Sequence, residues 1–306
     1  MMVFSVIGGD LRSAKLIDLL SKNPNFKVHH FGFEKLSTKK LKDLDIEPKK
    51  FSETSLNSLR ESIESCDVIL LPLPIIKGDF LNAPFNNSSI LISEIMKYRR
   101  ESHIVLAGNV KEDYLIKYPY IIDYYADEGL VIFNSIATAE GTVAIAIETS
   151  FRQIHGSKCL VLGFGRVGKI LSQVLKSLNG NVSVCARKET DLAYIESYGM
   201  KAINFSDLET EVSKFDFIFS SVPKLIMTKK ILQNVSKETL IIDLADGNGS
   251  VDFDSAKIFK LKVIHECGIP GRFVPITAAE NIYRTIIKII DSLPIQSNPI
   301  QIGVQH

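Results

Sequence analysis

The chain has 306 residues, 45% of them hydrophobic and 23% charged, which is enough for sizeable cores and predicts two domains. A formal net charge of +1 argues against nucleic acid or a membrane surface as a partner. No apolar run reaches the roughly 18 residues of a membrane span, and no signal peptide is expected. The four cysteines lack CxxC or metal spacing, so we expect a cytoplasmic protein without a metal site.

The first 20 residues predict a strand, a glycine turn and a helix. Asp10 and Arg12 stand in the turn, where a nucleotide-binding fold would keep small residues. Arg12 could hold a carboxylate through two hydrogen bonds, and Asp10 could orient Arg12 or a substrate amine or imine. The alternative is an ordinary N-cap aspartate beside a surface arginine.

Further apolar runs predict strands at 26–33, 66–74, 103–107 and 130–133, each followed by a small or polar break. Strands that alternate with helical patterns are typical of a doubly wound parallel sheet. We therefore expect a flavodoxin-like, substrate-binding α/β domain over residues 1–135.

Residues 136–153 predict a connecting helix that runs along a cleft between two α/β domains. Its first turn, near residue 138, would place polar side chains where substrate and nicotinamide meet. These are Asn134, Ser135, Thr138, Glu140 and Thr142. Helix capping alone would explain one of them.

Residues 158–188 contain a GxGxxG pattern between a predicted strand and a predicted helix, with a second strand after the helix. Gly163 permits the sharp turn, Gly165 leaves room for a pyrophosphate, and Gly168 lets the helix approach the sheet. The helix N-terminus would offer N–H groups to the anion. A Rossmann dinucleotide-binding domain is expected over residues 154–276.

The second strand of this unit ends in Arg187 and Lys188 rather than in an acidic residue. Cations suit a 2′-phosphate, so NADP is the expected cofactor, although a solvated loop pair is the alternative. A later strand ends at Val222 and Pro223 and should line the adenosine side. The expected cofactor contacts are Gly163, Phe164, Gly165, Arg166, Val167, Gly168, Arg187, Lys188, Val222 and Pro223. Residues 277–306 should form a C-terminal helix that packs back on the first domain, followed by a tail.

Several blocks together resemble the family of dipicolinate synthase A subunits over nearly the whole chain. They are IGGDLR (7–12), FNSIATAEGT (133–142), HGSKCLVLGFGRVG (155–168), DLA (243–245) and GIPG (268–271). The chain departs from the family pattern at Ala137, where a proline is usual, and in its ADGNGS loop (245–250).

This resemblance implies NADP-dependent oxidation of hydroxytetrahydrodipicolinate or dihydrodipicolinate to dipicolinate, on a branch of the lysine pathway during sporulation. It also implies that the partner is the dipicolinate synthase B subunit, with a location in the mother cell; a homo-oligomer is expected. A flat ring with two carboxylates would meet Arg12 at one end and hydroxyl donors at the other. The expected substrate contacts are Asp10, Arg12, Asn134, Ser135, Thr138 and Thr142, with Glu140 or His155 as general base.

Two other functions stay open. The architecture also resembles D-2-hydroxyacid dehydrogenases, but an acid, Asp246, stands where that family has its substrate-binding arginine, and Glu266 and Cys267 follow His265 in place of the family's small residues. Alternatively, the chain is a non-catalytic NADP-binding component of a partner enzyme.

Overall fold

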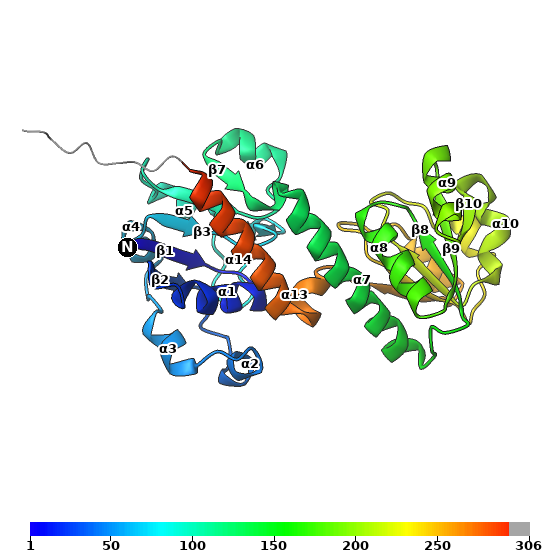
Figure 1. Cartoon of the computed structure of the whole chain (residues 1–306), viewed down its shortest axis with the longest axis horizontal. Helices are drawn as coiled ribbons and strands as arrows, with labels where there is room; N and C mark the ends of the chain where they lie inside the picture. Colours follow the sequence, from blue (N-terminus) through cyan, green and yellow to red (C-terminus); the bar gives the residue numbers. More distant parts are fainter. Residues whose placement is uncertain (294–306) are drawn as a thin grey trace, which may run out of the picture. The chain divides into compact units, whose positions relative to one another are not determined.

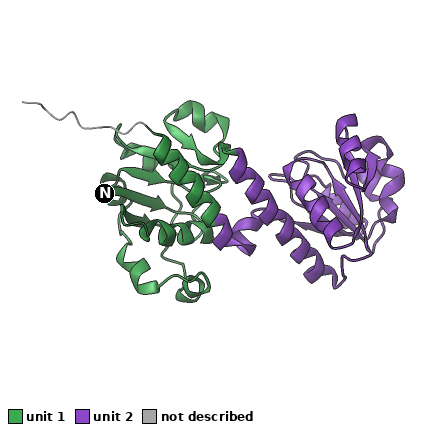
Figure 2. Ribbon diagram, viewed as in Figure 1, with its two compact units in different colours: residues 1–127, 279–306 green, residues 128–278 purple. Residues whose placement is uncertain are grey.

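The computed structural model describes residues 1–293 and divides into two compact units (Figure 2). Unit 1 comprises Met1–Asp127 and the segment from Ala279 onward, and unit 2 comprises Glu128–Ala278. The expected tail from residue 294 lies outside the described residues.

Unit 1 is built on a five-stranded parallel sheet in the order β2-β1-β3-β6-β7, the flavodoxin-like order (Figure 1). The strands are β1 (Met2–Ile7), β2 (Phe26–Phe31), β3 (Val68–Leu70), β6 (Ile104–Ala107) and β7 (Ile121–Asp123), with a hairpin of β4 (Ile76–Lys77) and β5 (Phe80–Leu81). The helices are α1 (Leu11–Ser21), α2 (Thr38–Asp43), α3 (Pro48–Glu53), α4 (Leu59–Glu64), α5 (Ile92–Lys97), α6 (Glu112–Lys117) and the 3-10 turn η1 (Tyr124–Ala126).

Helix α14 (Pro275–Ser292) returns most of its length to unit 1. Lys288 forms an ion pair of 2.7 Å with Asp127, and the Tyr283 hydroxyl accepts a long hydrogen bond of 3.5 Å from Asn23, just after α1. Its buried residues, among them Ala279, Ile282 and Ile286, follow the helical spacing of the sequence.

Unit 2 is a six-stranded parallel sheet in the Rossmann order β10-β9-β8-β11-β12-β13. Its strands are β8 (Lys158–Leu162), β9 (Asn181–Ala186), β10 (Lys201–Asn204), β11 (Phe217–Ser220), β12 (Leu240–Asp243) and β13 (Lys262–His265). Its helices are α7 (Glu128–Ser150), α8 (Arg166–Ser177), α9 (Glu189–Ser197), α10 (Leu208–Glu211), α11 (Lys229–Leu232), α12 (Phe253–Ile258) and α13 (Ile269–Phe273), with 3-10 turns η2 (Phe205–Asp207) and η3 (Val212–Lys214). The predicted fold of two doubly wound parallel sheets is confirmed.

The predicted strand at 130–133 is wrong, because these residues lie inside the 23-residue helix α7. The fifth strand of unit 1 is instead the three-residue β7, too short to stand out in the sequence. The apolar residues 130–133 have a high strand propensity. In the structure they are helical, because they belong to α7, which packs against α8 and α13 within unit 2. The predicted helix start near residue 138 is wrong for the same reason.

Small residues explain why α7 can pack so closely. A Cβ atom on Gly141 would lie 2.2 Å from Cγ2 of Ile269 in α13, so only glycine fits there. By length and composition α7 alone among the described helices could cross a membrane. However, half of its most apolar window is buried within the structure, as in an ordinary core helix.

Candidate functional site

Close packing within unit 2 explains why the first and third positions of the GxGxxG turn are glycines. Gly163 has φ +95°, and a Cβ there would lie 2.7 Å from Cγ2 of Val222. A Cβ on Gly168 would lie 2.1 Å from the Gly163 carbonyl oxygen. The third glycine therefore allows α8 to start directly against the end of β8.

Gly165 differs from its two neighbours, because nothing in the protein requires a glycine there. Its φ is −78°, and no described atom lies within 4 Å of where its Cβ would be. It is the N-cap of the 12-residue α8 and supplies no side-chain cap to the first N–H groups. The bare backbone and the free N–H groups together suit a pyrophosphate.

A cavity of about 390 Å³ opens beside this turn, at the carboxyl ends of β8, β9, β10 and β11. Of the predicted cofactor contacts, those that line it are Gly163, Phe164, Gly165, Arg187, Lys188, Val222 and Pro223. The remaining three lie on α8, outside the lining. Sequence reasoning missed Lys169, Asp191, Phe205, Ser221, Lys224 and Ile226. Phe205, Ser221 and Lys224 follow the carboxyl ends of β10 and β11, and ligands of parallel sheets bind at such ends. The predicted ends of these two strands could therefore have indicated them.

Arg166 is held by an ion pair rather than directed into this cavity. Its Nε and Nη2 atoms donate to the two Glu128 carboxylate oxygens, both at 2.7 Å. The contact ties the first turn of α8 to the first residue of α7. It also lowers the pKa of Glu128, mainly through the hydrogen bond from Arg166.

The other half of the sheet ends in a buried polar network around Asp243, the last residue of β12. Its Oδ1 accepts from the Ala245 N–H at 3.1 Å and from the Ser250 hydroxyl at 2.9 Å. The Ser250 and Ser220 hydroxyls lie 2.6 Å apart. Asp243 therefore shapes the loop after β12 and is fully buried, so it is not available to a substrate.

Beside that loop, His265 and Cys267 surround the Ala245 carbonyl. His265 Nε2 lies 2.8 Å from this oxygen, and Cys267 Sγ donates to it at 3.5 Å. Cys267 is exposed, whereas Cys66, Cys159 and Cys185 are buried. Partial burial, followed by the charges of Asp246 and Asp243, raises the pKa of the Cys267 thiol.

In unit 1, Asp10 and Arg12 form a closed pair at the end of β1. Arg12 Nη2 donates to Asp10 Oδ2 at 2.7 Å, and Nε lies 3.0 and 3.1 Å from the two carboxylate oxygens. Asp10 also caps α1 by accepting from the Arg12 N–H. Burial alone would lower the pKa of Arg12, but the Asp10 carboxylate outweighs burial and raises it.

Arg12 also joins two neighbouring strand ends. Its Nη2 donates to the carbonyl oxygen of Leu73, in the loop after β3. In the parallel sheet β2-β1-β3-β6-β7, successive strands are added on one side of β1 and then on the other. The crevice between the ends of β1 and β3, where this strand order reverses, is where ligands of flavodoxin-like sheets bind. The predicted pairing of Asp10 with Arg12 is present at that position, and it engages most of the guanidinium.

Three of the five polar side chains predicted on the connecting helix form hydrogen bonds with the backbone of α7 itself. The hydroxyls of Ser135, Thr138 and Thr142 each donate to the carbonyl four residues earlier, at 2.7 to 2.8 Å. Ser135 and Thr142 are buried, and Asn134 accepts the bond from Thr138. Since α7 begins at Glu128, no helix N-terminus lies near these residues.

The two candidate bases differ in position within unit 2. Glu140 is exposed on α7, next to Gly141, which contacts the Ile269 segment just past the carboxyl end of β13. His155 precedes β8 and therefore lies at the amino edge of the sheet, opposite Gly163. The structure does not bring His155 to the nucleotide cavity.

Two family models match most of the chain between them. Residues 3–118 match the N-terminal domain of the dipicolinate synthase A subunit, and residues 137–268 match the NAD binding domain of D-isomer specific 2-hydroxyacid dehydrogenases. The dipicolinate synthase A subunit of Bacillus subtilis (strain 168) is 27% identical over 293 residues, covering 94% of this chain and 95% of that protein.

Two solved structures agree with this match. The dipicolinate synthase A subunit from Bacillus halodurans superposes with a TM-score of 0.81 at 27% identity, covering 96% of this chain and 98% of that chain. The dipicolinate synthase A chain from Bacillus subtilis gives 0.77 at 25% identity, covering 95% and 96%. Over nearly its whole length the chain is therefore similar to the dipicolinate synthase A subunits.

Several of the sequence blocks that carry this resemblance have structural roles in the chain. Block 7–12 forms the Asp10–Arg12 pair, and Gly141 of block 133–142 admits α13. Block 243–245 contains the buried Asp243 that shapes the loop after β12. Within residues 1–293, no three His, Cys, Asp or Glu side chains cluster as metal ligands would.

Proposed function

We propose that this chain is an NADP-dependent oxidoreductase that forms dipicolinate from hydroxytetrahydrodipicolinate or dihydrodipicolinate. The observation that carries the proposal is the cavity at the glycine turn with its unpaired cations, in a chain similar to the dipicolinate synthase A subunits. Loss of water from the hydroxytetrahydro compound gives the dihydro compound. Transfer of one hydride to NADP⁺ and one proton to a base then gives the aromatic ring.

Arg187 and Lys188 support NADP rather than NAD as the cofactor. Both side chains are exposed, both line the cavity, and neither forms an ion pair with any described residue. They follow β9, where an NAD site would place a carboxylate for the ribose hydroxyls. When bound, the cofactor would supply the hydride acceptor.

For the proton, we propose Glu140 in preference to His155. A carboxylate next to the Gly141 contact lies on the carboxyl-end side of unit 2, where the nicotinamide half of a dinucleotide would bind. His155 is at the opposite edge of the sheet.

We also propose that Arg12, held by Asp10 and by the Leu73 carbonyl, orients a carboxylate of the substrate. The dipicolinate synthase B subunit is proposed from the family as the partner, together with homo-oligomerisation and a location in the mother-cell cytoplasm.

The test is to monitor NADPH and dipicolinate absorbance together, using the purified chain, NADP⁺ and freshly generated hydroxytetrahydrodipicolinate, with and without the B subunit. We expect the two signals to rise in a one-to-one ratio. No rise in either condition, together with oxidation of a 2-hydroxy acid, would instead indicate a D-2-hydroxyacid dehydrogenase. No turnover of either substrate, despite NADP⁺ binding, would indicate a non-catalytic component of a partner enzyme.

Cys267 offers a separate check on where the nicotinamide lies. We expect NADP⁺ to protect it from iodoacetamide, because the loops after β12 and β13 are where the second half of a dinucleotide would bind in a sheet of this order. Burial raises the pKa of each of the other three thiols to about 12, so they should not react in the folded protein. Mass spectrometry would locate the label. Equal labelling of Cys267 with and without saturating NADP⁺ would place the nicotinamide elsewhere.

A further inference from the structure

Four cations line the nucleotide cavity, namely Lys169, Arg187, Lys188 and Lys224, against one acid, Asp191. Arg187 and Lys188 follow β9, whereas Lys224 follows β11, on the far side of the central strand β8. We infer that Lys224 is a specificity-determining residue that binds the 2′-phosphate of NADP together with Arg187 and Lys188. This inference rests on the proposed use of NADP.

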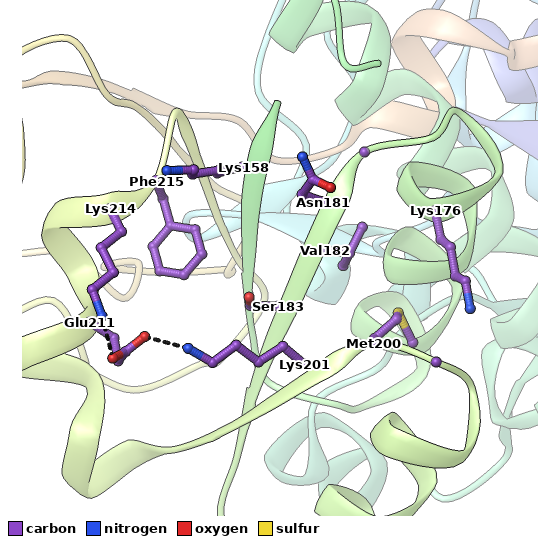
Figure 3. Close-up of a pocket in the computed structure, with 12 residues that line it drawn as sticks. Lys158, Lys176, Asn181, Val182, Ser183, Met200, Lys201, Glu211, Lys214 and Phe215 are labelled. Atoms are coloured by element: carbon purple, nitrogen blue, oxygen red, sulfur yellow. Dashed lines mark hydrogen bonds and ion pairs between the residues drawn. The ribbon is translucent and has the colours of Figure 1, made fainter. Parts of the chain in front are cut away.

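A second hollow in unit 2, at the opposite edge of the sheet, allows a comparison of how its lysines are arranged. It measures about 420 Å³ and lies at the amino edge of the sheet (Figure 3). Lys201 and Lys214 both reach Glu211, at 2.7 and 2.6 Å, and Lys176 donates to the Tyr198 carbonyl oxygen at the end of α9. Three of its four lysines therefore have protein partners.

The cavity at the carboxyl edge is different. Arg187, Lys188 and Lys224 are exposed and form no ion pair or side-chain hydrogen bond with any described residue, although they line one cavity. Four cations gathered around a single acid, Asp191, still repel each other, and a bound anion would relieve that repulsion. The unpaired positive charge of this cavity therefore indicates a ligand that carries a phosphate.

The positions of Lys169 and Lys224 in the fold indicate which phosphate of NADP each would bind. The pyrophosphate belongs at Gly165 and the N-terminus of α8, and of the four cations that line the cavity Lys169 is the one that lies on the first turn of α8. Its Nζ lies 5.2 Å from the centroid of the Phe164 ring. Lys224 lies instead in the turn after β11, where its N–H donates to the Val222 carbonyl at 2.8 Å. Val222 and Phe205 give this part of the cavity apolar walls suited to an adenine ring.

The test compares wild type, Lys224→Ala and Lys224→Arg by calorimetric titration with NADP⁺, NAD⁺ and adenosine 2′-monophosphate. Lys158→Ala is the matched control, because Lys158 lines the amino-edge hollow and has no side-chain partner among the described residues. For Lys224→Ala we expect about tenfold weaker binding of NADP⁺ and of adenosine 2′-monophosphate, the usual effect of one charge-assisted hydrogen bond. Binding of NAD⁺ should not change, Lys224→Arg should restore most of the loss, and Lys158→Ala should behave as wild type.

The outcomes separate this inference from the proposed function. If wild type prefers NADP⁺ and Lys224→Ala leaves all three affinities unchanged, the role of Lys224 is refuted while NADP use stands. Equal weakening of NAD⁺ and NADP⁺ would assign Lys224 to the pyrophosphate and also refute the inference. A wild type that ignores adenosine 2′-monophosphate and prefers NAD⁺ would refute both. Circular dichroism of each variant would show that differences in affinity do not arise from unfolding.

Discussion

Gly165→Val should abolish detectable dinucleotide binding while unit 2 loses only about 1 kcal/mol of stability, the cost of replacing a glycine N-cap by valine. The backbone of Gly165 has an ordinary φ, and no described atom lies near its missing Cβ, so the protein itself can accept a side chain there. A valine would occupy the space next to the N-terminus of α8 that the pyrophosphate needs. We expect at least about a 100-fold loss of NADP⁺ affinity, or about 3 kcal/mol. Calorimetric titration, together with thermal unfolding, would measure both quantities.

Gly168→Ala is the contrasting variant. Its Cβ would lie 2.1 Å from the Gly163 carbonyl oxygen, so α8 must move away from β8 and unit 2 should lose stability. Gly165→Val should therefore lose NADP⁺ affinity with little loss of stability, whereas Gly168→Ala should lose both. Normal NADP⁺ binding by Gly165→Val would show that the pyrophosphate does not lie over this turn, and the cofactor site would have to be placed elsewhere.

Arg12→Ala should destabilise unit 1 by about 3 kcal/mol, because it removes one partner of a buried ion pair. The substitution leaves the Asp10 carboxylate without its counter-charge and the Leu73 carbonyl without its donor. The Asp10 side chain is 25% exposed, so water can compensate in part, and we expect the lower end of the usual range for such pairs. Denaturant unfolding monitored by circular dichroism would give the change in the free energy of unfolding.

The same position also tests the role of Arg12 toward substrate. Arg12→Lys keeps the positive charge and should retain more stability than Arg12→Ala, but it cannot reproduce the two-point contact with Asp10. If Arg12 orients a substrate carboxylate, KM for the cyclic dicarboxylate should rise in Arg12→Lys under conditions where the variant is folded. An unchanged KM with lowered stability would leave Arg12 a purely structural residue of the β1–β3 edge.

Local sequence pattern was sufficient to predict most of the fold and the strand–turn–helix unit that contains the GxGxxG glycines. The roles of Gly163 and Gly168 depend on a strand, a turn and a helix that are contiguous in the chain. The same holds for Arg187 and Lys188, since their position at the end of β9 follows from the count of residues after the turn. Buried parallel strands appear in the sequence as short apolar runs, so both sheets could be predicted.

The extent of α7 and the roles of its hydroxyl groups depend on contacts between residues that lie far apart in the sequence. Residues 130–133 have the composition of a strand, but they are part of α7, which packs against α8 and, at Gly141, against Ile269 of α13. That helix in turn engages the hydroxyls of Ser135, Thr138 and Thr142 in its own backbone, which a list of polar residues could not reveal.

Charge pairing is the other property that the sequence alone could not determine. Arg12 and Lys224 are both cations beside turns, yet Arg12 is buried against Asp10 and the Leu73 carbonyl. Lys224 is instead exposed in the cavity beside the GxGxxG turn, without a side-chain partner among the described residues. The strand–turn–helix unit and its glycines follow from local sequence, because neighbouring residues dictate them. Only the folded chain decided which charges are neutralised and which remain available to a ligand, since the partners come from segments that lie far apart in the sequence.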